Sequence, residues 1–243
     1  MTAASRKRVA MGMNNGSVQP CCSALLETAV LHARAWRQAR VRCIQAPRAG
    51  DGACYGVLGN THSFGCRVKV MFRVLILGAS GTGTTTLGRA VGNDLSFRVF
   101  DTDDYYWLPS TPPFQRKQDP EVRLATLIQD LKVTSRAIIS GSILNWGAQL
   151  EDSLSLIVFL TVPTAVRIAR LEMREMRLYG RVDPEFLAWA AQYDEGKMSG
   201  RSREKHEQWL SQRACPVLRI EGDTSTVDRV RRVRAAIAEY CPI

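Results

Sequence analysis

Acidic residues are scarce in the first part of this chain of 243 residues. Residues 1–70 contain ten Lys or Arg but only Glu27 and Asp51, whereas residues 71–243 contain 23 basic and 21 acidic residues. The formal net charge of +10 therefore arises mainly in the first part, where ten basic against two acidic residues leave +8. The second part is nearly balanced, so its charge gives no reason to expect that it binds nucleic acid.

Long apolar runs and metal-binding cysteine patterns are also missing. No run approaches the roughly 18–20 apolar residues of a membrane-spanning helix, so we expect no membrane span. The seven cysteines include no Cys-x-x-Cys pair and no zinc spacing. An odd number of cysteines without a secretory signal is typical of a reducing compartment. We therefore expect a cytoplasmic protein, or one of an organelle stroma or matrix if residues 1–70 are a transit peptide.

Residues 1–70 are predicted to be a basic, disordered extension of a folded domain at residues 71–243. Arg-rich, acid-poor N-terminal segments are typical of organelle transit peptides. The segment is also compatible with an over-extended start, because Met71 immediately precedes the first predicted strand. A third interpretation is a basic arm that contacts acidic partners. None of the three gives this segment a folded function.

The most informative stretch is residues 72–87, which read FRVLILGASGTGTTTL. A short apolar strand runs into glycines and then into a helix, and this is the context in which a phosphate-binding loop is credible. From Gly78 to Thr85 the spacing fits G-x-x-x-x-G-[K]-[ST], except that Thr84 occupies the lysine position. Glycines allow successive N–H groups to approach an anion, and the helix N-terminus adds its own. We predict a nucleotide phosphate site; the alternative is an ordinary tight turn between a strand and a helix.

Further strands and helices alternate after this loop. The pattern predicts an α/β fold, a doubly wound, mostly parallel five-stranded sheet with the P-loop NTPase arrangement, whose ligands lie at the carboxyl edge. A helical lid insertion is expected at about residues 178–212, since its glycines and basic residues suit a segment that closes over phosphates. Strands are predicted at 74–77, 97–101, 137–139, 156–162 and 217–220, and helices at 84–95, from 120, from 163, at 184–193, around Trp209 and at 226–240.

Two carboxylates follow the second strand. In an extended segment Asp101 and Asp103 would point to the same side, where they could hold Mg²⁺ through water and accept a hydrogen bond from a substrate hydroxyl. The alternative is a solvated acidic turn. After the third strand, Ser140 occupies a position at which many P-loop proteins carry a second acid near the metal.

Five arginines recur at helical spacing after residue 163. They fall within a stripe about 80° wide, and neither Glu172 nor Glu175 is three or four residues from any of them. The stripe favours a polyanion as its partner, with Met173 and Met176 packing elsewhere; a solvated face neutralised by distant acids is the alternative. His206, in the predicted lid, is interpreted as a helix-surface residue rather than a base. The stripe consists of Arg167, Arg170, Arg174, Arg177 and Arg181.

Residues 71–243 resemble the P-loop kinases of the adenylate kinase, shikimate kinase and gluconate kinase group. The resemblance is carried by GASGTGTTT, by FDTDD after the second strand, by VPTAVRIARLEMR and by RIEGD before the last helix. The chain is most similar to an adenylate-kinase-like branch, labelled as AAA-family ATPases, whose loop has Gly-Thr in place of Gly-Lys.

The resemblance implies ATP and Mg²⁺ as cofactors, with Thr85 and Asp101 on the metal side. It implies that Asp103 binds the acceptor, that Arg174 binds phosphate and that Arg170 stacks on adenine. Asp101, Asp103 and Arg174 are thus the expected catalytic residues. The residues expected to bind nucleotide are Gly78, Ser80, Gly81, Thr82, Gly83, Thr84, Thr85, Thr86, Arg170 and Gly222.

The leading hypothesis for function is a small-molecule or nucleotide kinase, which moves the γ-phosphoryl of ATP to a small acceptor. The missing lysine and the missing acid at Ser140 favour a second hypothesis, a nucleotide-binding ATPase, switch or pseudokinase that phosphorylates no acceptor. The third hypothesis is a nucleic-acid-associated protein that uses residues 1–70. That segment lacks interleaved aromatic residues, since Trp36 and Tyr55 are isolated, so nucleic acid is not an expected partner.

Overall fold

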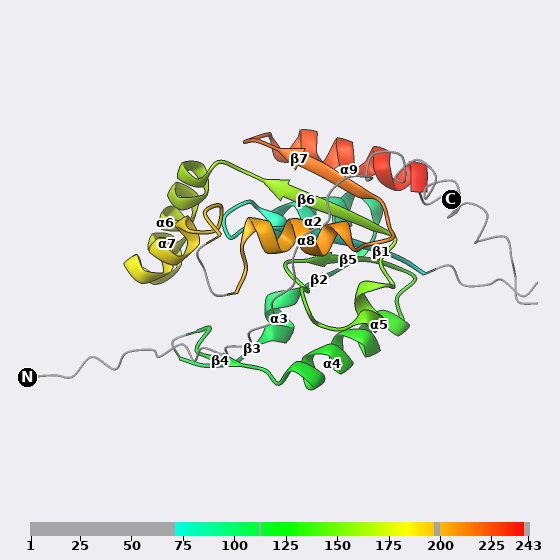
Figure 1. Cartoon of the computed structure of the whole chain (residues 1–243), viewed down its shortest axis with the longest axis horizontal. Coiled ribbons are helices and arrows are strands. Elements are labelled where there is room, and N and C mark those ends of the chain that lie inside the picture. The colour runs from blue at the N-terminus through cyan, green and yellow to red at the C-terminus, as the bar shows by residue number, and fades with distance from the viewer. Residues whose placement is uncertain (1–70, 112, 197–199, 241–243) are drawn as a thin grey trace, which may run out of the picture. The chain divides into compact units, whose positions relative to one another are not determined.

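The computed structural model describes residues 71–111, 113–196 and 200–240 (Figure 1). The predictions for residues 1–70 lie outside this part of the chain. None of the helices within it is long and apolar enough to cross a membrane. In chain order the elements are β1 (Phe72–Gly78), α2 (Thr84–Leu95), β2 (Arg98–Asp101), α3 (Thr102–Tyr106), β3 (Trp107–Leu108), β4 (Arg116–Lys117), α4 (Pro120–Lys132), β5 (Arg136–Ser140), α5 (Ala148–Glu151), β6 (Leu156–Thr161), α6 (Thr164–Tyr179), α7 (Pro184–Ala191), α8 (Arg203–Ser211), β7 (Val217–Glu221) and α9 (Thr226–Tyr240).

Five strands form one parallel sheet in the order β2-β5-β1-β6-β7. The central strand is β1, which pairs with β5 on one side and β6 on the other, so that Ile76 lies opposite Ser140 and Val158. Helices connect successive strands and return the chain to the same edge. The predicted fold class, a doubly wound α/β protein, is confirmed.

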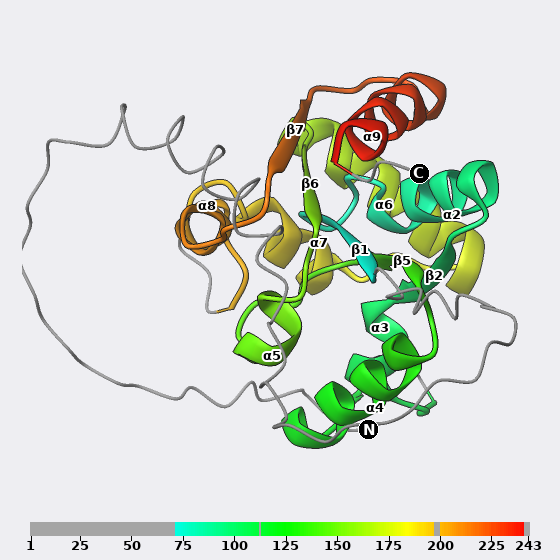
Figure 2. The same cartoon turned by 90° about the vertical axis from the view of Figure 1, so that its right-hand side faces the viewer.

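Alternate side chains of β1 supply the cores of the two faces. Leu75 and Leu77 belong to a buried cluster with side chains of α4, α5 and α8. Val74 and Ile76 belong to a second cluster with side chains of α2 and α9. Figure 2 shows α2 and α9 on one side of the sheet and α4, α5 and α8 on the other. Burial on both faces explains why β1 is an uninterrupted apolar run rather than an alternating one.

The sequence predicts several helix ends correctly. The predicted helices at residues 84–95 and 226–240 have these bounds in the structure. The Asp-Pro signal at residue 119 also marks a helix start, because Asp119 Oδ1 accepts hydrogen bonds from the amides of Glu121 and Val122, at 2.9 and 3.2 Å. Each boundary is determined by residues within one turn of it.

The extended geometry predicted for residues 101–103 is wrong. The strand β2 ends at Asp101 and the short helix α3 begins at Thr102. Asp101 caps this helix, since its Oδ1 accepts a hydrogen bond from the amide of Asp103 at 3.2 Å. An aspartate favours a strand end and a helix N-cap alike, so the pattern alone does not separate them. The hairpin of β3 and β4 was not predicted either, because two-residue strands carry no periodicity.

The segment predicted as a lid, about residues 178–212, consists of two different parts. Its second helix, α8, buries Trp209 and Leu210 in the same core cluster as Leu75. That helix is therefore part of the core. The lid stays a prediction for α7, which packs against α6, and for the loops beside it.

Candidate phosphate-binding and acceptor site

The turn between β1 and α2, residues 78–85, is the glycine-rich loop. Gly81 and Gly83 have φ angles of 85° and 92°, values at which other residues are strained. A Cβ atom on Gly81 would also lie 2.6 Å from the carbonyl oxygen of Arg167. Glycine is thus required at Gly81 both by its backbone conformation and by the close approach of α6.

Three arginines contact the carbonyl oxygens of the glycine-rich loop. They come from α6 and α9, elements far from the loop in sequence. Each guanidinium donates to a different carbonyl, so three successive carbonyls point toward positive charge. The bonds join Arg167 Nη1 to Ser80 O at 3.3 Å, Arg170 Nη1 to Gly81 O at 3.4 Å, and Arg229 Nη1 to Thr82 O at 2.7 Å.

Unlike the loop carbonyls, which accept hydrogen bonds from arginines, several amides of the glycine-rich loop have no backbone partner among the described residues. Within the described residues, the amides of Gly81, Gly83, Thr84 and Thr85 donate no backbone hydrogen bond. The last two belong to the first turn of α2, whose N–H groups have no partner inside the helix. Unpaired amides at a helix N-terminus form an anion site. The chain therefore offers an array of donors that fits the phosphates of a nucleotide.

Thr85 and Asp101, the two residues expected to hold the metal, are in contact with each other. Thr85 Oγ1 donates a hydrogen bond to Asp101 Oδ2 at 2.9 Å. Across the sheet, Asp101 lies opposite Ser140, whose Oγ is buried and has no hydrogen-bond partner among the described residues. Among the residues that the structure describes, no group of three or more His, Cys, Asp or Glu side chains could hold a metal ion. One hydroxyl and one carboxylate suit Mg²⁺ when phosphates and water complete its oxygen ligands.

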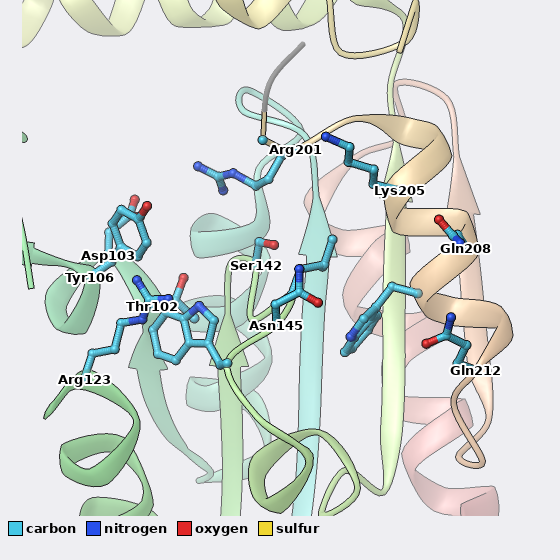
Figure 3. Close-up of a pocket in the computed structure, with 14 residues that line it drawn as sticks. Thr102, Asp103, Tyr106, Arg123, Ser142, Asn145, Arg201, Lys205, Gln208 and Gln212 are labelled. Carbon is cyan, nitrogen blue, oxygen red and sulfur yellow. The ribbon is translucent and has the colours of Figure 1, made fainter. Parts of the chain in front are cut away.

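A cavity of about 600 Å³ lies between α3, α4 and α8. Figure 3 shows Asp103, Tyr106 and Arg123 on one side of it, with Lys205 and Gln208 on the other. The volume is typical of a small-molecule site. Its lining combines cations, amides and aromatic rings: Thr102, Asp103, Tyr106, Arg123, Ser142, Leu144, Asn145, Trp146, Gly200, Arg201, Lys205, Gln208, Trp209 and Gln212.

Asp103 is the acidic residue among those that line the cavity. Its side chain is accessible, but the cavity walls displace bulk water, and this desolvation raises the pKa of its carboxyl. Arg201 and Arg174 act in the opposite direction, and Asp101 adds to the rise. The carboxyl is thus within electrostatic reach of two arginines and can accept a hydrogen bond from a bound hydroxyl.

Arg201 connects the two parts of the site. It lines the cavity together with Asp103, and it also lines a narrow crevice whose other wall is formed by Gly78, Ala79 and Ser80 of the glycine-rich loop. Its guanidinium carbon lies 5.9 Å from the centroid of the Trp189 ring. A cation is therefore placed between the expected phosphate site and the expected acceptor carboxylate.

Two aromatic rings hold Arg123 on the cavity wall. The rings of Tyr106 and Trp146 are nearly parallel, with centroids 6.5 Å apart. The Arg123 guanidinium carbon lies 4.7 Å from the first centroid and 4.8 Å from the second. Contact with two ring faces fixes the position of a long side chain and favours its charge. The sequence gives no sign of this role for Arg123, because the rings lie on segments that are distant in the chain.

The Glu151 carboxylate holds the two tryptophans that line the cavity, Trp146 and Trp209, by hydrogen bonds. Its Oε1 accepts hydrogen bonds from the amides of Trp146 and Gly147, at 3.1 and 3.3 Å. Its Oε2 accepts from Trp209 Nε1 at 2.8 Å and from Arg213 Nη1 at 3.0 Å. Because the carboxylate is buried, these bonds are the ones that compensate for its desolvation.

Replacing this carboxylate should destabilise the protein. We expect Glu151→Gln to lower the free energy of unfolding by about 1.5–3 kcal/mol, the range for hydrogen bonds to a buried charged group. The matched control is Asp152→Asn, since Asp152 also pairs with Arg213, at 3.5 Å, but is 74% exposed. Urea denaturation of both variants is the measurement. Equal effects would show that Glu151 is not the anchor.

The arginine stripe does not face a polyanion along its length, and this prediction is corrected. Arg167 is 1% exposed and pairs with Asp194, Nη2 to Oδ2 at 2.8 Å. The two methionines expected to pack, Met173 and Met176, are 68% and 54% exposed. The first arginine of the stripe, Arg167, therefore points inward. The loop carbonyl and the Asp194 carboxylate that it contacts compensate for the burial of its charge.

The arginines predicted for the nucleotide and the phosphate lie at the surface. Arg170 is paired with Asp223, the residue after Gly222. Arg174 Nη2 is 3.2 Å from Glu175 Oε1. Both arginines are partly exposed, so each can contact a ligand after a change of rotamer.

His206 is not a helix-surface residue, and this prediction is wrong. It is fully buried, and its Nδ1 lies 2.6 Å from the hydroxyl of Tyr193. Burial and the nearby charge of Arg201 lower the pKa of His206 to about 3, so its ring is neutral at pH 7.

Arg229 was missed, although the sequence contains a signal for it. It is 4% exposed and lies on the buried face of α9, four residues before Val233 and eight before Ile237. Arg229 Nη2 also donates to the carbonyl of Gly222 at 3.0 Å, so it connects that glycine to the loop. A cation at i, i+4, i+8 spacing with apolar residues indicates a buried partner.

A parallel sheet with this strand order and a glycine-rich loop after its central strand define a doubly wound α/β protein, and the unpaired amides of that loop can bind an anion. No protein-family model matches the chain. Over 168 residues it is 41% identical to the uncharacterized protein YqaC of Bacillus subtilis (strain 168), and the match covers 65% of this chain and 93% of YqaC. The chain belongs to the family of YqaC.

Solved structures with a similar arrangement include two kinases. A gluconokinase from Sinorhizobium meliloti 1021 is 16% identical, with a TM-score of 0.45, over 69% of this chain and 92% of that one. A shikimate kinase from Bacteroides thetaiotaomicron is 19% identical, with a TM-score of 0.46, over 70% of this chain and 99% of that one. Likeness at these identities concerns the fold alone.

Proposed function

We propose that the protein is a kinase that transfers the γ-phosphoryl of ATP to a small acceptor bound in the cavity. The observation that carries the proposal is the position of Arg201, which lines both the crevice beside the glycine-rich loop and the cavity that contains Asp103. A phosphoryl group that passes from one site to the other remains close to this guanidinium. Stabilising charge along that path is the main task of a protein in phosphoryl transfer.

Different residues of the site bind ATP and the acceptor. The amides of Gly81, Gly83 and Thr84 hold the phosphates of ATP. Thr85 and Asp101 are the residues that would hold Mg²⁺, which supplies charge neutralisation to the phosphate oxygens when it is bound. Asp103 accepts a hydrogen bond from the acceptor hydroxyl and orients its oxygen toward the γ-phosphorus.

Arg201 compensates for the lysine that the loop lacks. Thr84 brings no charge to the phosphates, and the guanidiniums of Arg167 and Arg229 are engaged with loop carbonyls and other buried acceptors. Arg201 is intermediate in exposure, borders the loop, and has a planar fork that suits phosphate oxygens.

Arg170 is expected to contribute to nucleotide affinity. We predict that Arg170→Ala weakens ATP binding about tenfold, because a guanidinium next to the loop both supports Gly81 and can stack on the base. Titration calorimetry with ATP measures this. The control is Arg177→Ala on the same helix, where the side chain is exposed and an unchanged affinity is expected. If both variants bind ATP as the wild type does, Arg170 has no place in the nucleotide site.

Kinase activity is tested by ATP consumption over a panel of nucleosides, nucleotides and hydroxy acids. The proposal predicts turnover that depends on one class of acceptor and disappears in the double variant Thr85→Ala, Asp101→Asn. ATP binding without any acceptor-dependent turnover would contradict it.

That second outcome would support a nucleotide-binding switch or pseudokinase. Two observations favour this alternative: Thr84 replaces the loop lysine, and Ser140, whose buried hydroxyl has no partner among the described residues, stands where an acid would assist the metal. The same panel, run together with calorimetry, separates the two functions.

A further inference from the structure

A buried hydrogen-bond chain ends at the cavity and has no assigned role. His206 lies at its centre, where its Nδ1 is 2.6 Å from the Tyr193 hydroxyl and its Nε2 is 3.4 Å from Ser142 Oγ. The ring also makes an edge contact with Phe159, with centroids 5.9 Å apart. Ser142 lines the cavity, and Figure 3 shows it between the two side walls.

The direction of this chain follows from counting protons. A neutral imidazole has one N–H and one nitrogen that accepts. Among the described residues, His206 Nδ1 is the only hydrogen-bond partner of the Tyr193 hydroxyl, and a buried hydroxyl proton without an acceptor is unfavourable. The phenol therefore donates to Nδ1, and Nε2 carries the ring proton. That N–H points to Ser142 Oγ, which accepts it and keeps its own proton for a ligand.

We propose that Tyr193, His206 and Ser142 form a directed chain that makes Ser142 a hydrogen-bond donor to an anionic oxygen of the acceptor. Ser142 is then a specificity-determining residue, and His206 and Tyr193 are positioning residues that act through it. The inference rests on the proposed kinase function only in taking the occupant of the cavity to be the acceptor.

The rest of the cavity fits an anionic occupant. Arg123, Arg201 and Lys205 line it together with one carboxylate, that of Asp103. With Asp103 engaged by a hydroxyl, the remaining charged groups are donors only. Because the histidine does not accept the Ser142 proton, that proton is available to the occupant, and carboxylate or phosphate oxygens, which only accept hydrogen bonds, are its best partners.

The direction of the hydrogen-bond chain can be read from the His206 ring by ¹⁵N NMR. The experiment uses the full-length protein labelled at histidine. Three histidines are present, His32, His62 and His206, and His206→Gln identifies the signal of interest. We expect a protonated Nε2 and an unprotonated Nδ1 that accepts a hydrogen bond. A proton on Nδ1 would overturn the proposal, because the Ser142 proton would then be directed to the histidine.

Two variants separate this role from a structural one. Tyr193→Phe is expected to shift the Nδ1 resonance toward that of a nitrogen without a hydrogen bond. Ser142→Ala is expected to shift the Nε2 resonance and leave Nδ1 nearly unchanged, and it removes only one cavity atom. An Nε2 signal that is identical in Ser142→Ala and wild type would show that the chain stops at the histidine.

The ligand is tested with two probe anions, acetate and inorganic phosphate, titrated with and without saturating ADP. We expect at least one probe to shift the Nε2 resonance saturably, and the more effective probe to identify carboxylate or phosphate as the preferred group. The shift should be lost in Ser142→Ala and kept in Gln212→Ala, which alters another cavity residue. No shift with either probe would refute the anionic assignment. Failure of ADP to bind would count against the kinase proposal instead, since the tautomer is measured independently.

Discussion

Arg201→Ala is expected to lower acceptor-dependent turnover by about 10²–10³-fold, the usual loss when one preorganised donor to transition-state charge is removed. The reason is specific to this chain: Thr84 supplies no ammonium, and Arg201 is the arginine that lines both the crevice beside the loop and the cavity. The loss should appear in kcat, because charge on the transferring group develops only in the transition state. Initial rates of ADP formation with the best acceptor of the panel are the measurement.

The matched control for this effect is Arg203→Ala. Arg203 lies two residues further along, is 48% exposed and is 4.0 Å from Asp194, so its removal should change kcat less than threefold by the usual small effect of surface pairs. Arg201→Lys keeps the charge but not the fork, and an intermediate rate is expected. Equal rates for Arg201→Ala and Arg203→Ala would remove Arg201 from the mechanism.

Arg167→Met is expected to have the largest effect on stability, about 3–5 kcal/mol, which is typical when one partner of a buried ion pair is removed. The guanidinium donates to the carbonyls of Val162 and Ala190 as well as to Ser80, and it pairs with Asp194. Methionine fills much of the volume but leaves those acceptors without a donor. Chemical denaturation followed by circular dichroism measures the change.

A control on the same helix isolates the effect of burial. Arg177→Met replaces an exposed arginine of α6 and should change the free energy of unfolding by less than about 0.5 kcal/mol. The double variant Arg167→Met, Asp194→Asn should be less destabilised than the sum of the single changes, because the carboxylate is then no longer unpaired. Additive effects would mean that the ion pair of Arg167 and Asp194 is not coupled.

Local sequence determines the features that were predicted well. The apolar run of β1, the glycines after it and the first turn of α2 lie within 16 residues of one another, and each enforces its conformation through its own backbone. The cap at Asp119 is local in the same way. The alternation of such units restricts the topology to parallel sheets with right-handed crossovers, which is why the fold class followed from the sequence.

Long-range partners determine the features that were not predicted. The period of α6 identifies a stripe of arginines but does not show that Arg167 meets Asp194 from beyond α7, since that contact spans 27 residues. His206 is similar, because its burial depends on Tyr193 and on Phe159 of β6. Most buried polar groups have a hydrogen-bond partner that the fold supplies, and a helical pattern carries no information about such partners.

For Asp101 and Asp103, the sequence identifies the candidate residues but does not predict their backbone geometry. Both were selected as candidates for the edge of the sheet, and they remain so. The helix α3 separates their roles, since Asp101 is bonded to Thr85 while Asp103 lines the cavity. The choice between strand and N-cap depended on the following residues, whose short helix carries too few positions for a period.

The most direct test of the account is an amide NMR titration of the full chain with ATP and Mg²⁺. If the glycine-rich loop holds the triphosphate, the amide resonances of Gly81, Gly83 and Thr84 should shift saturably and together, and the Arg201 guanidinium signal should shift with them. Loop amide resonances that do not shift at millimolar ATP would contradict the proposal that this loop binds the triphosphate.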